Sequence, residues 1–190
     1  MRKFLLSFLL AISATAANAD VLTADIKSAA DLPYCCQRSG PLTAEYSGAI
    51  GSGFEINGST AFDNPSIWSG GRVFIDLNPS TGLLTLDSQD NLDFQTYVLT
   101  IDNLTFDAGQ YLRGLSLVSD QLTTNAAAQF SFTGNSLRIA YDSRDIFNFT
   151  TNNAVFQLDI GQRSDVPEPA NLALFGLALA ALAGARRRKT

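Results

Sequence analysis

The stretch that decides the fold is AVFQLDI, residues 154–160. Apolar side chains occupy every second position in it: Ala154, Phe156, Leu158 and Ile160. Because successive side chains of a β-strand point to opposite faces, this spacing places the whole apolar set on one face of a pleated strand. The stretch therefore predicts a strand whose apolar face is buried.

The same two-residue alternation recurs upstream, at Val73/Ile75/Leu77, Tyr97/Leu99/Ile101, Phe130/Phe132 and Leu137/Ile139/Tyr141. Turn-forming residues separate the runs, at 78–82, 87–91, 107–109, 134–135 and 152–153. Many short strands with a turn every ten or so residues are typical of an antiparallel sandwich. We predict an all-β chain that folds as an antiparallel β-sandwich, of jelly-roll or immunoglobulin-like type, with seven to nine strands. The strand order is not readable, and the region before Gly71 is the least defined.

The beginning of the chain has the pattern of a secretory signal peptide. Arg2 and Lys3 precede a short apolar core at residues 4–12, and Ala17-Asn18-Ala19 forms an A-x-A cleavage site. The core is shorter than the roughly 20 residues that a spanning helix needs. We expect residues 1–19 to be a signal peptide that the secretion translocon reads, and residues 20–161 to be an extracytoplasmic β-sandwich domain.

The part of the chain between the two ends is strongly acidic. All 18 acidic side chains of the chain lie between Asp20 and Glu168. The same stretch holds seven bases, so its net charge is −11 against −5 for the whole chain; the bases are Lys27, Arg38, Arg72, Arg113, Arg138, Arg144 and Arg163. A surface of this sign does not attract nucleic acid or anionic lipid by charge. We therefore expect no nucleic-acid partner.

Residues suited to catalysis are scarce. The chain has no histidine, which removes Ser-His-Asp and Cys-His systems and zinc sites with histidine ligands. Between residues 20 and 165, glutamate occurs only as Glu45 and Glu55, and most aspartates lie in turn-like contexts. We expect the chain not to be an enzyme. A secreted hydrolase that uses a pair of aspartates is the remaining enzymatic alternative.

One loop gathers carboxylates that suit calcium. Asp87, Asp90 and Asp93 lie in Asp-Ser-Gln-Asp-Asn-Leu-Asp, and oxygen ligands of this kind suit Ca²⁺. The spacing matches no EF-hand, and an acidic turn between two strands is the favoured interpretation. Asp102 and Asp107 are weaker candidates. We expect no cofactor, with Ca²⁺ at this loop as the alternative.

Cys35 and Cys36 are adjacent, and they are the only cysteines. An exported protein meets an oxidising compartment, so paired cysteines usually form a disulfide. Three states are open: a strained bridge between the two neighbours, a bond to another chain, or two free thiols. We favour the bridge between Cys35 and Cys36.

The end of the chain has three parts in a fixed order. Val166-Pro167-Glu168-Pro169 is followed by an apolar run from Leu172 to Ala185 and by the basic residues Arg186, Arg187, Arg188 and Lys189. The two prolines keep the backbone extended, and the positive-inside rule places the four cations in the cytoplasm. We expect residues 162–169 to form a linker, residues 170–185 a transmembrane helix and residues 186–190 a cytoplasmic tail. At 1.5 Å per residue the apolar run rises about 21 Å, short of the ~30 Å hydrocarbon core, which suits a temporary anchor.

This tail resembles the PEP-CTERM sorting signal of Gram-negative bacteria, which is also called an ice-binding-protein C-terminal motif. The resemblance covers residues 166–190 and implies an exosortase-type membrane transpeptidase as partner. It also implies export, transient anchoring, and transfer to the cell surface or extracellular matrix. The expected role is structural or adhesive in exopolysaccharide or biofilm. A carbohydrate- or Ca²⁺-binding sandwich is the alternative, and no regular threonine ladder supports ice binding.

Overall fold

The computed structural model describes residues 20–34, 41–57, 73–89 and 91–162. These ranges contain nine β-strands, and no helix occurs among them. The strands are β1 (Val21–Asp31), β2 (Leu42–Ala49), β3 (Val73–Leu77), β4 (Leu83–Ser88), β5 (Asp93–Phe106), β6 (Gln110–Asp120), β7 (Gln129–Phe132), β8 (Leu137–Asn148) and β9 (Asn153–Gln162). The all-β prediction is confirmed for the described part of the chain.

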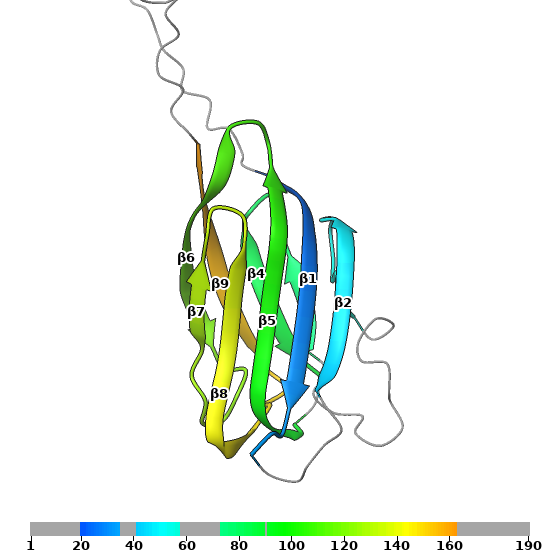
Figure 1. Cartoon of the computed structure of the whole chain (residues 1–190), viewed down its shortest axis with the longest axis vertical. Helices are drawn as coiled ribbons and strands as arrows, with labels where there is room; N and C mark the ends of the chain where they lie inside the picture. Colours follow the sequence, from blue (N-terminus) through cyan, green and yellow to red (C-terminus); the bar gives the residue numbers. More distant parts are fainter. Residues whose placement is uncertain (1–19, 35–40, 58–72, 90, 163–190) are drawn as a thin grey trace, which may run out of the picture.

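The strands form two antiparallel sheets that lie face to face (Figure 1). Sheet A has five strands in the order β2-β1-β5-β8-β7, and sheet B has four in the order β3-β4-β9-β6. Three pairs are hairpins within one sheet: β1–β2, β3–β4 and β7–β8. The other connections cross from one sheet to the other, which is the arrangement of a sandwich.

A continuous apolar core fills the space between the sheets. Sheet A contributes the inward faces of β5 and β8, and sheet B those of β4 and β9. At one end of the core, Phe149 packs against the rings of Phe94, Tyr97 and Phe147, with centroids 5.4, 5.6 and 5.8 Å away. Edge-to-face and tilted aromatic pairs of this kind stabilise a core beyond the area they bury.

Most of the predicted apolar faces are buried, and one is not. The alternating residues of β3, β5, β8 and β9 lie in the core, apart from Ile160 at the end of β9, which is partly buried. Phe130 and Phe132 of β7 point to the inner side of sheet A but remain 40% and 43% exposed. The reason is position, because β7 is the last strand of its sheet and the margin beside it is open.

The edge of sheet B at β3 is closed by a short segment around Glu55 and Ile56. Ile56 forms an isolated bridge with Ile75, in which the Ile75 N–H donates to the Ile56 carbonyl at 2.9 Å. This bridge occupies both backbone groups of Ile75 on the free side of β3, so part of this edge is covered.

Several predictions fall on residues outside the described ranges. These are the signal peptide with Ala17 and Ala19, the Cys35–Cys36 pair, Asp90, and the tail from Arg163 onward. In the part of the chain that the structure does describe, no helix is long and apolar enough to cross a membrane.

Candidate binding pocket on the outer face of sheet A

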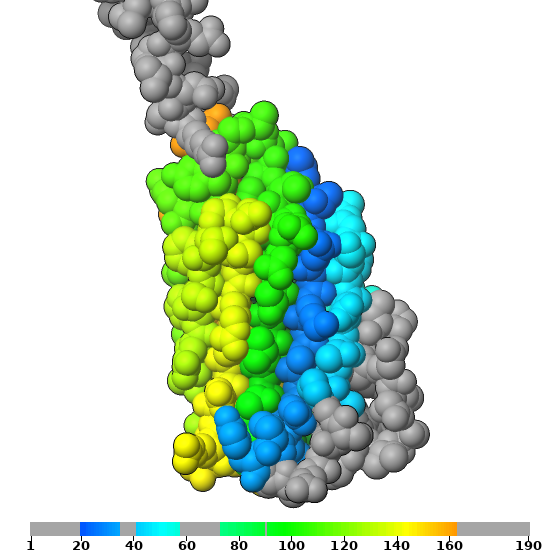
Figure 2. Space-filling model, viewed as in Figure 1, coloured from blue at the N-terminus to red at the C-terminus, as the bar shows by residue number. Residues whose placement is uncertain are grey.

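A pocket of about 400 Å³ lies on the outer face of sheet A. Three strands line it: β1 with Asp25, Ile26 and Lys27, β2 with Glu45, Tyr46 and Ser47, and β5 with Asp102 and Asn103. Figure 2 shows this face of the molecule, with β1 and β2 in blue and cyan beside β5 in green. Most residues that line the pocket have polar side chains, so they can donate hydrogen bonds to a ligand or accept them from it.

Strand register brings these residues together from distant parts of the sequence. Asp25 lies opposite Ser47 on one side and opposite Asp102 on the other, and Lys27 lies opposite Glu45. The pairing of β1 with β5 is irregular between Thr23 and Asp25. Such irregularities bend a strand and re-aim side chains, which here accompanies the hollow beside Asp25.

Asp25 is held in place by two side-chain donors. The Asn103 Nδ2 donates to Asp25 Oδ2 at 2.6 Å, and the Ser47 hydroxyl donates to Asp25 Oδ1. These hydrogen bonds, that from Asn103 foremost, lower the pKa of the Asp25 carboxyl below its ordinary value. Asp25 is therefore a fixed anion at neutral pH.

Asn103 adopts a backbone conformation that is uncommon for its residue type. Its φ is +51°, in the left-handed region that asparagine tolerates better than most residues. This conformation accompanies the donation of its amide to Asp25. The side of the pocket formed by β5 thus depends on one residue that combines an unusual backbone angle with a side-chain donor.

The pocket carries more negative than positive charge. Lys27 forms an ion pair with Glu45, and both side chains are largely exposed, at 59% and 61%. Asp25 and Asp102 have no such cation among the pocket residues, so three carboxylates face one ammonium. An exposed pair of this kind contributes little to folding, typically less than about 1 kcal/mol. The pocket therefore favours neutral hydroxyl-bearing or cationic ligands over anions.

The described residues include no group of three or more His, Cys, Asp or Glu that could hold a metal ion. Of the predicted calcium loop, Asp90 lies outside the described ranges. Asp87 Oδ2 accepts Gln89 Nε2 at 2.8 Å, and Asp93 accepts the Asn148 amide. Both described carboxylates thus bond to amide side chains, Asp87 from within β4 and Asp93 from the start of β5. The calcium alternative stays a prediction.

Sequence reasoning did not find this pocket. From the sequence, Glu45 stands out only as one of two glutamates between residues 20 and 165, and Asp102 only as a weaker calcium candidate. The pocket exists because β1 pairs with β2 on one side and with β5 on the other, and β5 is about 75 residues further along the chain. No local pattern in the sequence carries that information.

The second candidate functional feature is the tail that follows β9. A comparison with protein-family models identifies the motif in this tail. The family model of the PEP-CTERM protein-sorting motif matches residues 165–189. The chain carries a PEP-CTERM sorting motif. The match includes Val166, Pro167, Glu168 and Pro169 together with the basic residues from Arg186 to Lys189. No match was found among curated proteins or among solved structures.

The PEP-CTERM motif accounts for how the chain is handled by the cell. It marks an exported protein that an exosortase-type membrane enzyme sorts, with a transient membrane anchor before the protein reaches the surface. The resemblance seen in the sequence is thereby confirmed.

Proposed function

We propose that this chain is a structural or adhesive protein of the cell surface or exopolysaccharide matrix of a Gram-negative bacterium. The observation that carries the proposal is the PEP-CTERM motif at residues 165–189, which begins directly after β9 ends at Gln162. A folded sandwich followed at once by a sorting signal is the arrangement expected of a cargo domain. The signal peptide at residues 1–19 would bring this domain to the translocon.

The tail would act in two steps. The apolar run would hold the chain in the inner membrane while Arg186 to Lys189 stay in the cytoplasm. Pro167 and Pro169 would keep the backbone at Glu168 extended. Glu168 would then lie where the inner membrane meets water on its non-cytoplasmic side, and a transpeptidase could recognise it there. Cleavage there would release the sandwich from its anchor.

A second candidate function is carbohydrate binding, and the pocket on sheet A favours it. Carboxylates such as Asp25 and Asp102 accept hydrogen bonds from sugar hydroxyls, and the Lys27 ammonium can donate one. The excess of negative charge favours neutral or amino sugars over uronic acids. Adhesion to matrix polysaccharide would then be a property of the sandwich itself.

Catalysis is not part of the proposal. The chain lacks histidine, and its pocket carboxylates are exposed or, like Asp25, held as anions by donors. A hydrolase of the two-carboxylate type would need one of them to stay protonated by burial.

The matrix role is tested by following the exported protein in cells that make exopolysaccharide. We expect wild type to remain with the washed matrix and to be released when the polysaccharide is enzymatically depolymerised. A protein with Asp25→Asn and Asp102→Asn should reach the surface but wash off at least tenfold more readily. Asp142→Asn, on the exposed part of β8, is the matched control and should behave as wild type.

Two results would contradict these proposals. If wild type washes off in buffer alone, the matrix role is wrong. If wild type and the double variant are retained equally, the matrix role stands and carbohydrate binding in this pocket is wrong.

A further inference from the structure

One margin of the sandwich carries few charged side chains in an otherwise acidic domain. Every side chain from Gln121 to Leu137 is uncharged, and so is every side chain from Gly114 to Ser119. The intervening Asp120 accepts a hydrogen bond from the Tyr141 hydroxyl at 2.9 Å. Between Asp20 and Glu168 the chain has 18 acids against seven bases, so two copies repel least where these strands meet.

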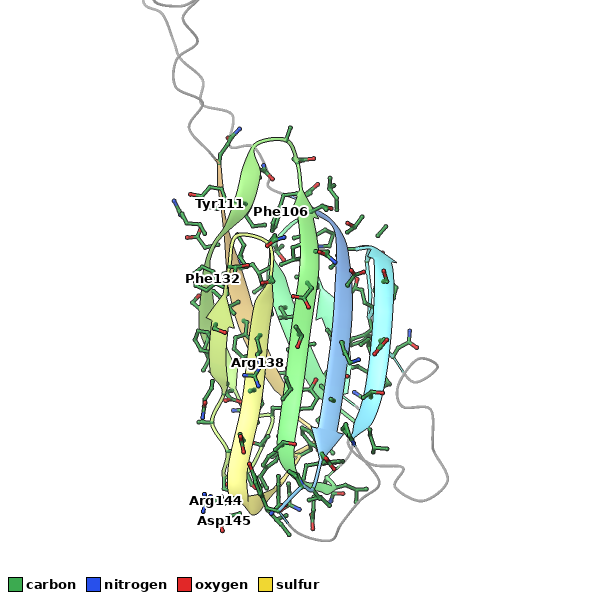
Figure 3. All side chains as sticks on the ribbon, viewed as in Figure 1. Phe106, Tyr111, Phe132, Arg138, Arg144 and Asp145 are labelled. Atoms are coloured by element: carbon green, nitrogen blue, oxygen red, sulfur yellow. The ribbon has the colours of Figure 1, made fainter. Side chains whose placement is uncertain are left out.

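The same margin exposes apolar side chains. Phe130 and Phe132 of β7 are 40% and 43% exposed, and Leu117 and Val118 of β6 are 40% and 60% exposed. β6 and β7 are the terminal strands of the two sheets and lie side by side at this margin. Figure 3 shows Phe132 on β7 at the margin, beside β8 with Arg138. Exposed apolar side chains gathered on two neighbouring strands often mark an interaction site.

The hydrogen bonds of the β7–β8 hairpin show which backbone groups of β7 point away from β8. Thr133 N–H donates to the Ser136 carbonyl at 2.8 Å in the β7–β8 hairpin. Because hydrogen-bonded pairs alternate along an antiparallel ladder, Ser131 and Gln129 bond to β8. The N–H and C=O groups of Phe130 and Phe132 therefore point away from β8. Within the described ranges, β7 has no second neighbouring strand.

We propose that two copies of this chain associate by antiparallel pairing of β7 with β7, about a two-fold axis that passes through Ser131. In this register Phe130 of each copy lies opposite Phe132 of the other, and these residues exchange four backbone hydrogen bonds. Sheet A then continues from one copy into the next. This inference goes beyond the proposed matrix function and does not rest on it.

The register follows from the geometry of β7 alone. Two residues that lie opposite each other across the paired strands must point their side chains to the same face of the sheet. When β7 pairs with its own copy, this condition holds only if the two-fold axis passes through a residue position rather than between two residues. An axis at Ser131 makes both outward-pointing backbone pairs meet and places four phenylalanine rings on one face. Cross-strand aromatic pairs of this kind stabilise antiparallel strand pairing.

A second copy fits this edge better than another partner does. The edge is self-complementary under a two-fold axis, as a symmetric dimer requires. Natural edge strands avoid pairing by being very short or by carrying a charge, a proline or a bulge. β7 is short, at four residues, but it has no charge, proline or bulge. β6 in contrast is interrupted by register shifts near Arg113 and Val118, which disfavour pairing along its free side.

Disulfide trapping tests the axis directly. Ser131 and its counterpart form a non-hydrogen-bonded pair, with Cα atoms expected about 4.5 Å apart, within reach of a disulfide. Full-length Ser131→Cys protein in detergent, with Cys35→Ser and Cys36→Ser, should cross-link to a dimer under mild oxidation. Ser116→Cys, an exposed serine on β6, is the matched control and should stay monomeric. Equal cross-linking at both positions, or none at Ser131→Cys, would overturn the proposal.

A charge pair provides a second test that does not depend on cysteine. Ser131→Lys should weaken self-association at least tenfold in sedimentation velocity, because two ammonium groups and the neighbouring Arg138 side chains would meet at the axis. Mixing Ser131→Lys with Ser131→Glu should restore a dimer. A wild type that sediments as a monomer at tens of micromolar, or a Ser131→Lys protein that dimerises like wild type, would contradict the β7 contact.

Discussion

Glu55 Oε2 accepts the backbone N–H of Leu77 at 2.9 Å, which joins a buried carboxylate to the edge strand β3. The Glu55 residue is only 6% exposed, and its other oxygen accepts the Gly51 N–H at 3.4 Å. Together with the Ile56–Ile75 bridge, this contact covers part of the β3 edge of sheet B. Glu55 is therefore a structural carboxylate, a role that the sequence alone does not assign.

Burial gives Glu55 a measurable pH signature. Desolvation, with a smaller contribution from Asp76, raises the pKa of Glu55 above 4.5 despite the opposing backbone hydrogen bonds. A raised pKa in the folded state means that the native protein holds its proton longer than the unfolded chain. The contribution of Glu55 to stability is thus fully present below the unfolded value and decreases as the pH rises toward the folded value.

Glu55→Gln should remove this decrease. In urea unfolding followed by circular dichroism, the difference in stability between variant and wild type should shift in favour of the variant as the pH rises from 4 to 7. A constant difference across this range would show that Glu55 does not titrate as its burial implies.

Tyr141 is fully buried, and its hydroxyl donates to Asp120 Oδ1 at 2.9 Å. Tyr141→Phe keeps the ring and removes the donor, so the expected loss is about 1.5–3 kcal/mol, typical of a hydrogen bond to a charged group. Tyr46→Phe removes a bond to a neutral acceptor, the Ala49 carbonyl, and should cost about 1 kcal/mol. Chemical denaturation compares the two variants, and equal losses would contradict a special role for Asp120.

Gly82 and Gly109 provide a matched pair for the turns. Both have left-handed φ values, +67° and +82°, so alanine strains the backbone at either position by roughly 1–2 kcal/mol. At Gly82 a Cβ would also lie 2.9 Å from the Leu158 carbonyl oxygen, whereas at Gly109 nothing lies within 4 Å. Gly82→Ala should therefore lower the melting temperature more than Gly109→Ala. The reverse order would show that the turn at Gly82 can move away from β9.

The parts of the fold that the sequence predicts are those where the alternation is regular. The stretch at residues 154–160 and the runs in β3, β5 and β8 have large apolar residues on one face, and the structure buries nearly all of them. β6 is different, because a register shift near Arg113 places its buried residues Leu112 and Leu115 three apart rather than two. A period-2 search does not find such a strand.

The alternation of apolar and polar residues does not predict the inward face of β1, for another reason. Its buried positions include Ala24, Ser28 and Ala30. These side chains are small or polar, so their hydrophobicity differs little from that of the exposed positions. β1 lies at the centre of the pocket, so neither this strand nor the pocket is found from the sequence. The exposure of Phe130 and Phe132 also depends on strand order, which local patterning does not encode.

The sorting motif, in contrast, is contiguous in the sequence and was predictable from it. Its recognition needs only the order of Pro-Glu-Pro, apolar run and basic end, which the family match at residues 165–189 confirms. What the sandwich binds is a separate question, because its pocket is assembled from three strands.

The central claim is that residues 166–190 direct sorting, and intact mass combined with cell fractionation tests it most directly. Wild type is compared with a protein in which Pro167, Glu168 and Pro169 are changed to alanine. We predict that wild type loses its tail and reaches the surface fraction, whereas the variant keeps its full tail and stays in the inner membrane. If both proteins keep the tail and remain in the membrane, the segment is a simple anchor and the account is wrong.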